Sequence, residues 1–389
     1  MQFAHAASTE PDAADAAAQV TAAVKERLAG PVDLAVLMCT HGYRNHFGRL
    51  LAAVHGGLAP GCLVGCTAEG VFGGGREFER VPAVTLLAGS LPGVMLHPWV
   101  LEAEDLAAGD LESRLRARGL PLDGAAHSLV LLADPFTTPA DALLGAIDAV
   151  CPGWAVAGGM ASGGRVEGDG RLFLDDRAVE SGAVGVALAG NLRMRTLVSQ
   201  GCRPIGRPFV ITRADRNFLL ALGGRPAVEC VRQVYADESE PVRRLISDGL
   251  MVGRVIDEHR DRFGRGDFLV RSVLGFDEER GAVVAGDFFR AGQTIQFHVR
   301  DAATADEDLA ELLAAAREGG VPAAGLCFSC NGRGTRMFDE PNHESAAIFR
   351  ALGGFPLVGH FAAGEFGGVG GRTFVHGHTL SLALFAAGE

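Results

Sequence analysis

Two side chains that can share a proton occupy the same position in two similar glycine-rich stretches. Cys66 is the second residue of GCTAEG (65–70), and His360 is the second residue of GHFAAG (359–364). An imidazole within hydrogen-bond reach of a thiol can take its proton and leave a nucleophilic thiolate. The alternative is a small buried cysteine and a hydrogen-bonded histidine. Because no complete catalytic set follows from these spacings, we assign no catalytic residue and expect both side chains to contact a ligand.

Two glutamates accompany these stretches. Glu69 is the fifth residue of GCTAEG, and Glu365 directly follows GHFAAG. A carboxylate accepts hydrogen bonds from a ligand amine or from a backbone N–H group. We therefore expect both glutamates to contribute to a ligand site.

A cysteine pair lies near the C-terminus. Cys327 and Cys330 form a C-x-x-C motif. A zinc site needs a second pair, for which the chain offers only the looser spacing of Cys62 and Cys66. A redox motif should begin a helix, whereas this one ends a predicted strand. We therefore expect no metal ion and no cofactor, and we place Cys330 at the strand end, beside the ligand.

The turn NGRG (331–334) follows this cysteine pair directly. Asn331 begins the turn and is expected to face the same ligand site. The guanidinium fork of Arg333 can take a ligand carboxylate through two hydrogen bonds. It can equally form a salt bridge with Glu340 or Glu344, and the sequence leaves both interpretations open.

The glycine-rich stretch occurs three times, as G-x-x-A-x-G followed by R-x-F. We call residues 65–70, 158–163 and 359–364 the first, second and third glycine loops. VGCTAEGVFGG (64–74) and VGHFAAGEFGG (358–368) are identical at 7 of 11 positions. Glycine allows close backbone approach, and free N–H groups in such turns hold anions. We therefore expect Gly65, Gly159 and Gly359 in the ligand wall; the alternative is tight packing without a ligand.

Each glycine loop lies in the same succession of predicted elements. A strand, an amphipathic helix and a short strand lead into the loop, and a hairpin-like pair follows it. These segments run at about 32–89, 127–190 and 322–387. They predict an α/β fold of two related α/β domains, with mixed sheets flanked by helices and built from strand-helix-strand-GxxAxG repeats. Ligands in such folds favour the carboxyl ends of strands, where all three loops lie.

Composition excludes several classes of protein. The 389 residues carry a formal net charge of −12 and no basic cluster, so we expect no nucleic-acid partner. No apolar segment is long enough to cross a bilayer, and the N-terminus lacks the regions of a signal peptide, so we expect no membrane association. The eight cysteines form no secreted disulfide pattern, which favours a cytoplasmic location.

Several longer motifs resemble the FIST family of intracellular signal transduction proteins. They are SQGCRPIGRPF (199–209), CFSCNGRG (327–334) and FPLVGHFAAGEFGG (355–368), together with GCTAEGVF and GGMASGG in the first half. The resemblance implies a FIST N-terminal domain at 30–200 and a FIST C-terminal domain at 201–387. It also implies a cytoplasmic sensory module that binds a small, amino-acid-like ligand. We expect the chain to act without an output domain of its own and a separate signalling protein to receive the signal.

Three classes of function remain open at this point. The first and preferred class is a small-ligand-binding sensory module in signal transduction. The second is an enzyme on a small metabolite that uses Cys66 or Cys330 with His360. The third is a protein-interaction scaffold. A closed cavity lined by the glycine loops favours the first class, and a thiol–imidazole pair in a pocket favours the second.

Overall fold

The computed structural model describes residues 1–107, 109–118, 120, 127–260 and 262–388. The chain is 27% helix and 42% strand, arranged as mixed sheets flanked by helices in two domains, which confirms the predicted α/β class. It forms two compact units. Unit 1 comprises Met1–Val198, Ala310–Val375 and Thr379–Glu389, and unit 2 comprises Ser199–Leu309 and His376–His378. The bounds of these units differ from the division into a domain at 30–200 and a domain at 201–387 that the family resemblance implies. That division of the sequence stays a prediction.

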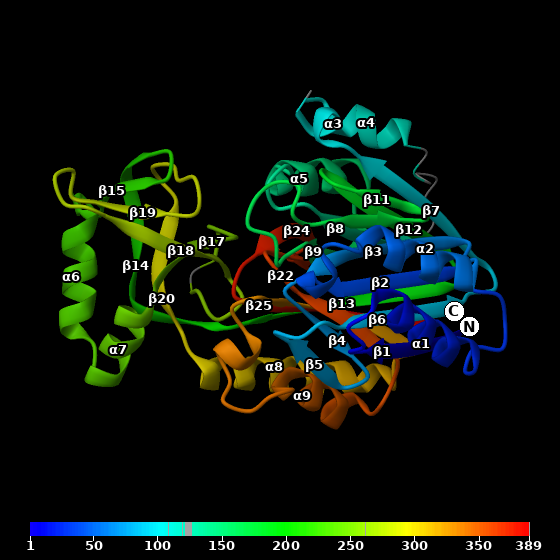
Figure 1. The fold of residues 1–389 in the computed structure, drawn as a ribbon. Helices are drawn as coiled ribbons and strands as arrows, with labels where there is room; N and C mark the ends of the chain where they lie inside the picture. Colours follow the sequence, from blue (N-terminus) through cyan, green and yellow to red (C-terminus); the bar gives the residue numbers. More distant parts are fainter. Residues whose placement is uncertain (108, 119, 121–126, 261, 389) are drawn as a thin grey trace. The chain divides into compact units, whose positions relative to one another are not determined.

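Unit 1 contains the three segments that carry a glycine loop, except for His376–His378 of the third (Figure 1). The first segment contains β2 (Leu34–Thr40), α2 (Phe47–Leu58), β3 (Cys62–Ala68), β4 (Gly70–Gly73), β5 (Arg76–Glu79) and β6 (Val84–Ser90). The second contains β8 (His127–Ala133), α5 (Ala140–Val150), β9 (Ala155–Met160), β10 (Leu172–Leu174), β11 (Arg177–Val179) and β12 (Ala183–Gly190). The third contains β21 (Ala324–Cys330), α9 (His343–Leu352), β22 (Leu357–Ala362), β23 (Glu365–Val369), β24 (Arg372–His376) and β25 (Thr379–Ala387). The order of elements is the same in each; their origin from one repeated unit stays a prediction.

The first two strands of each segment are parallel and are joined through a helix. β2 pairs with β3, β8 with β9 and β21 with β22. Parallel neighbours need a crossover, and an amphipathic helix is the usual one. α2 shows why: its buried residues, Phe47, Leu50, Leu51, Val54 and Leu58, recur at helical spacing on one face.

The hairpin that follows each glycine loop leaves its own sheet and joins another segment's sheet. β4 pairs with β22 of the third segment, β10 pairs with β3 of the first, and β23 pairs with β9 of the second. Each segment therefore gives one hairpin and receives one. This cyclic exchange brings the three glycine loops to one place, because each loop is the crossing point between two sheets.

The inner faces of the three sheets of unit 1 share one apolar core. The core includes Val64 and Cys66 of β3, Val130 of β8, and Leu326 and Phe328 of β21. Helices cover the outer faces: α1 and α2 bury side chains against β2, β3 and β6, and α5 buries side chains against β8 and β9. The loops therefore lie where three apolar layers converge.

The remaining elements of unit 1 extend these sheets and their helical cover. They are β1 (Gln2–Ser8), α1 (Ala13–Lys25), β7 (Val94–Leu101), α3 (Ala103–Ala107), α4 (Leu111–Ala117) and β13 (Leu192–Gln200). The Asp12 side chain caps α1 by accepting from the N–H groups of Ala14 and Asp15. Ser8 ends β1, which pairs with β6.

Unit 2 is a β sheet that closes on itself beside two helices. Its strands are β14 (Cys202–Asp215), β15 (Phe218–Leu222), β16 (Arg225–Pro226), β17 (Leu250–Val255), β18 (Phe268–Asp277), β19 (Ala282–Ala285) and β20 (Thr294–Arg300). The helices are α6 (Ala227–Asp237) and α7 (Glu240–Asp248), and α8 (Ala302–Ala316) leads back to unit 1. The sheet order runs from β14 through β20, β17, β18 and β19 to β15, and β14 also pairs with β15.

No helix in the described part of the chain combines the length and the apolar character that a membrane crossing requires.

Candidate functional site

The second glycine loop lies between the other two and bonds to both. The Ser162 hydroxyl accepts from the Glu69 N–H at 2.8 Å and donates to the Phe361 carbonyl. The Met160 N–H donates to the Gly364 carbonyl at 2.8 Å, and the Ser162 N–H donates to the Thr67 carbonyl at 3.2 Å. Segments far apart in sequence are thus joined at the loops by a short hydrogen-bond network within unit 1.

The first glycine of each loop is a packing position. A Cβ atom at Gly65, Gly158 or Gly359 would lie 1.8–1.9 Å from the carbonyl oxygen of the neighbouring parallel strand. A carbon atom cannot approach an oxygen to which it is not bonded so closely, so only glycine fits there. Gly65 and Gly359 were expected in a ligand wall; they lie against adjacent strands instead, and close packing explains them.

The second residues of the three loops meet at the centre. The Cys66 Sγ atom lies 3.8 Å from both ring nitrogens of His360. A Cβ atom at Gly159 would lie 2.9 Å from the Ala362 Cβ and 3.6 Å from the His360 Nε2. Cys66 and His360 therefore lie together, and the missing side chain at Gly159 leaves room for the imidazole.

The Cys66–His360 pair is buried and uncharged. Both side chains are 0% exposed. Burial raises the pKa of the Cys66 thiol well above its usual range, and burial lowers the pKa of His360 to about 4. His360 Nε2 donates to the Met160 carbonyl at 3.1 Å. A thiol held in its neutral form is a poor nucleophile, so this geometry does not activate Cys66.

Arg333 is engaged in a buried ion pair. Its Nε atom lies 2.6 Å from Oε1 of Glu344, and the two side chains are 1% and 0% exposed. The Ser329 hydroxyl donates to the other carboxylate oxygen of Glu344 at 2.7 Å. Of the two interpretations of Arg333, a ligand fork or a salt bridge to Glu340 or Glu344, the structure contains the salt bridge to Glu344. A buried pair of this kind is costly to break because it leaves a charge unpaired.

Glu365 is a buried carboxyl group held by Thr379. Its Oε2 atom accepts from the Thr379 N–H at 3.1 Å and from the Thr379 hydroxyl at 2.6 Å. Burial raises the pKa of Glu365 to about 8, although hydrogen bonds from Thr379 and Cys330 act in the opposite direction. The group is therefore protonated near neutral pH. Cys330 ends β21 as expected, but it is only 8% exposed.

A polar cavity of about 390 Å³ opens beside the first and second glycine loops. We call it the polar cavity. Each of the three segments contributes at least one residue to its lining, and all of these residues belong to unit 1. Its lining comprises Thr40, His41, Gly42, Glu69, Arg80, Val81, Pro82, Gly163, Gly164, Arg165 and Asn331. Glu69 and Asn331 are the two predicted ligand residues that the structure places here.

Sequence reasoning missed the two arginines of this lining. Arg80 follows β5, and its backbone is left-handed, with φ of 59°. Arg165 follows the second glycine loop. Among the residues that the structure describes, neither guanidinium group forms a hydrogen bond or an ion pair. Their only signal in the sequence is nearness to a loop, since Arg165 comes two residues after Gly163.

Glu69 is held in place by Arg336. The Arg336 guanidinium binds both carboxylate oxygens of Glu69, with 3.0 Å between Nη1 and Oε2, and it donates to the Asn331 carbonyl at 2.5 Å. This bidentate contact joins the first segment to the third and orients the Glu69 carboxylate. A small hollow of about 10 Å³ lies between Glu69, Glu79, Arg80 and Arg336 and adjoins the polar cavity through their shared residues.

No group of three or more histidine, cysteine, aspartate or glutamate side chains in the described part of the chain is placed to hold a metal ion. Cys327 and Cys330 are both buried, as are Cys62 and Cys66.

Comparison with known proteins identifies the family. The FIST N domain matches residues 33–225, and the FIST C domain matches residues 227–368. The chain is 43% identical over 383 residues to the uncharacterized protein Rv0628c of Mycobacterium tuberculosis, covering 97% of this chain and 98% of the relative. It is 42% identical over 381 residues to the uncharacterized protein Mb0898c of Mycobacterium bovis, covering 97% of each. FIST domains are associated with sensing in signal transduction. The chain therefore belongs to the FIST family.

Proposed function

We propose that this chain is a sensory module that binds a small, amino-acid-like ligand in the polar cavity. One observation carries the proposal: a cavity of about 390 Å³, bordered by the first and second glycine loops, contains an oriented carboxylate and two arginines that have no ion-pair partner among the described residues. Cavities of roughly 300–1,000 Å³ hold small molecules in proteins. The mixed charges suit a zwitterion better than an apolar compound.

The lining offers a complement for each end of an amino acid. The guanidinium groups of Arg80 and Arg165 can hold a carboxylate through charge-assisted hydrogen bonds. The Glu69 carboxylate and the Asn331 side chain can accept from an ammonium group. Because Arg336 already orients Glu69, little side-chain freedom is lost there on binding.

The position of the polar cavity also suits a sensor. Its lining comes from all three segments, with Glu69 from the first, Arg165 from the second and Asn331 from the third. A ligand that contacts all three stabilises the arrangement in which the segments interlock. Such a ligand shifts the population toward that arrangement by the difference in its affinity for the two states. We propose that a separate signalling protein reads this shift, in the cytoplasm, where free cysteines stay reduced.

The alternative enzyme function is weaker on this geometry. The distance of 3.8 Å between Cys66 and His360 is the observation in its favour. Neither residue is among those that line the polar cavity, and burial keeps the thiol protonated. A substrate in the cavity would therefore meet no activated nucleophile from this pair.

A ligand screen tests the proposal. The purified chain is heated with each of the twenty amino acids, because a ligand that binds only the folded state raises the melting temperature. Any amino acid that raises it is then titrated by calorimetry into the parent, Arg165→Gln, Arg80→Gln and, as a control, Arg49→Gln. Arg49 is exposed on α2 and contacts Asp12 only at 3.8 Å.

Loss of one charge-assisted contact is expected to weaken binding about tenfold or more in Arg165→Gln and Arg80→Gln. The Arg49→Gln variant should bind as the parent does. Equal binding by all three variants would contradict the assignment of the ligand to the polar cavity. A screen in which no amino acid stabilises the chain would contradict the proposed ligand class.

A further inference from the structure

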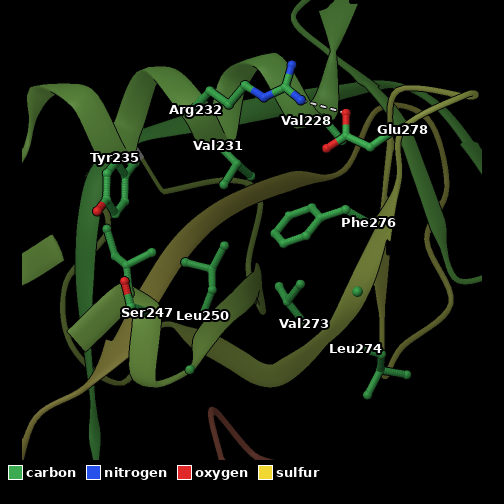
Figure 2. A pocket seen from close by; sticks show the side chains of 13 residues that line it. Val228, Val231, Arg232, Tyr235, Ser247, Leu250, Val273, Leu274, Phe276 and Glu278 are labelled. Carbon is green, nitrogen blue, oxygen red and sulfur yellow. Dashed lines mark hydrogen bonds and ion pairs between the residues drawn. The ribbon is translucent and has the colours of Figure 1, made fainter. Parts of the chain in front are cut away.

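Unit 2 contains a second cavity, which is mainly apolar, unlike the polar cavity in unit 1. It measures about 500 Å³ and lies between α6, α7 and β18 (Figure 2). We call it the apolar groove. The face of α6 that borders it carries Val228, Val231, Arg232 and Tyr235, which recur at the spacing of one helix face. Leu250, Val273 and Phe276 form the opposite side.

The floor of the apolar groove is continuous with the core of unit 2, and its wall is open. Val228 and Leu250 are 4% and 7% exposed and belong to that core. Tyr235 and Phe276 are 42% and 49% exposed. Aromatic rings on the wall of a cavity, half in solvent, leave apolar area that an occupant can cover.

Polar contacts close the groove at two places. The Arg232 guanidinium bonds to the Glu278 carboxylate at 2.6 Å, joining α6 to the end of β18 (Figure 2). At the Tyr235 end, Arg243 of α7 donates to the carbonyl of Tyr235 at 2.9 Å and to that of Ala236 at 2.8 Å. Polar contacts therefore flank the apolar groove beside Arg232 and beside Tyr235. The apolar side chains of α6 that border the groove, from Val228 to Tyr235, span only about two helical turns, which is short for a groove that takes a partner helix.

We propose that the apolar groove is a second ligand site, which takes an uncharged, mainly apolar small molecule. Its volume lies in the range of small-molecule sites, and most of its lining is aliphatic or aromatic. The charges at its rim, Arg232 and Glu278, already neutralise each other, so the groove offers no net charge to an ion. The Tyr235 hydroxyl can donate to or accept from such a ligand, and the Ser247 hydroxyl, which already donates to the Arg243 carbonyl at 2.9 Å, can accept from it. This site is independent of the polar cavity in unit 1.

An uncharged fluorescent dye tests the proposal on the full chain. Nile red is titrated into the parent, Val231→Trp and Val210→Trp, and emission is followed together with circular dichroism and thermal unfolding. Val231 borders the apolar groove, so a tryptophan there should fill it. Val210 is a 51% exposed residue of β14 that is not part of the lining, and it serves as the matched control. We expect saturable binding at one site per chain, weakened at least tenfold in Val231→Trp and unchanged in Val210→Trp.

A second variant keeps the test decisive if Val231→Trp does not fold. Gly275 borders the groove, and a Cβ atom there would meet no atom within 4 Å, so Gly275→Trp can fill the space without displacing the core. Equal dye binding in the folded filling variant and the parent would overturn the proposal, as would the absence of saturable binding. A parent that dimerises in sedimentation, through an interface that the filling variant abolishes, would also overturn it, because a second copy would then cover the groove.

Discussion

Replacing Gly359 by alanine tests whether the glycine loops depend on close packing between strands. The new Cβ atom would lie 1.8 Å from the Cys327 carbonyl oxygen, although real Cβ atoms do not come closer than 3.0 Å to such neighbours. β21 and β22 pair in register at this point, Cys327 opposite Gly359. The strands must therefore separate by about 1.2 Å, the difference between these two distances.

The cost combines two effects. Overpacking costs about 1–3 kcal/mol, and each backbone hydrogen bond lost from the ladder adds about 1 kcal/mol. With one or two such bonds lost, we expect Gly359→Ala to lower the free energy of unfolding by roughly 2–5 kcal/mol. Gly145 in α5 is the control, because a Cβ atom there meets nothing within 4 Å. Gly145→Ala should raise the stability by roughly 0.5–1 kcal/mol, since alanine favours a helix interior.

Urea unfolding followed by circular dichroism measures both variants against the parent. The two changes in stability are expected to have opposite signs although both variants replace glycine by alanine, so the difference reports the surroundings of each glycine. If Gly359→Ala unfolds at the same urea concentration as the parent, the strands are not packed as closely as described, and the packing explanation of the loops is wrong.

Three further predictions concern buried groups around the loops. Arg333→Met should lower the free energy of unfolding by roughly 3–5 kcal/mol, because Glu344 is left buried without its partner; Arg333→Met/Glu344→Leu, measured by the same urea titration, should recover much of the loss. The pKa of Glu365 is raised to about 8 from 4.5, so its contribution to stability is present below pH 4.5 and is lost as the pH rises to about 8. Glu365→Gln should therefore gain stability relative to the parent across that interval, and a constant difference would contradict the assignment. Cys66 should resist a thiol reagent in the folded chain and react after unfolding; rapid modification of Cys66, located by mass spectrometry, would show an accessible thiolate.

Local sequence patterns were sufficient to predict the order of elements in each segment. An amphipathic helix was expected between the first two strands, and α2 occupies that place with its apolar residues on one face, because burial of one face is a local periodic signal. The distance of 3.8 Å between Cys66 and His360 was not predictable in this way, because equivalent positions in similar stretches do not fix how far apart the stretches lie.

The exchange of hairpins was not predictable from these patterns. β4 has the same alternation whether it pairs within its own segment or with β22, so strand periodicity does not identify the partner. Arg80 and Arg165 are exposed arginines outside any motif, and only the fold brings them to one cavity. For Arg333, the sequence provides the charge and the candidate acids, but burial of the pair with Glu344 depends on long-range packing.

A crystal structure of the chain grown with the amino acid that stabilises it most tests the central claim directly. The claim is that a cavity bordered by the first and second glycine loops and by Asn331 holds a small charged ligand. We expect electron density for the ligand in the polar cavity, with its carboxylate beside Arg165 and its amine beside Glu69. Ligand density elsewhere, or a cavity filled by its own side chains while the ligand is bound, would contradict the claim.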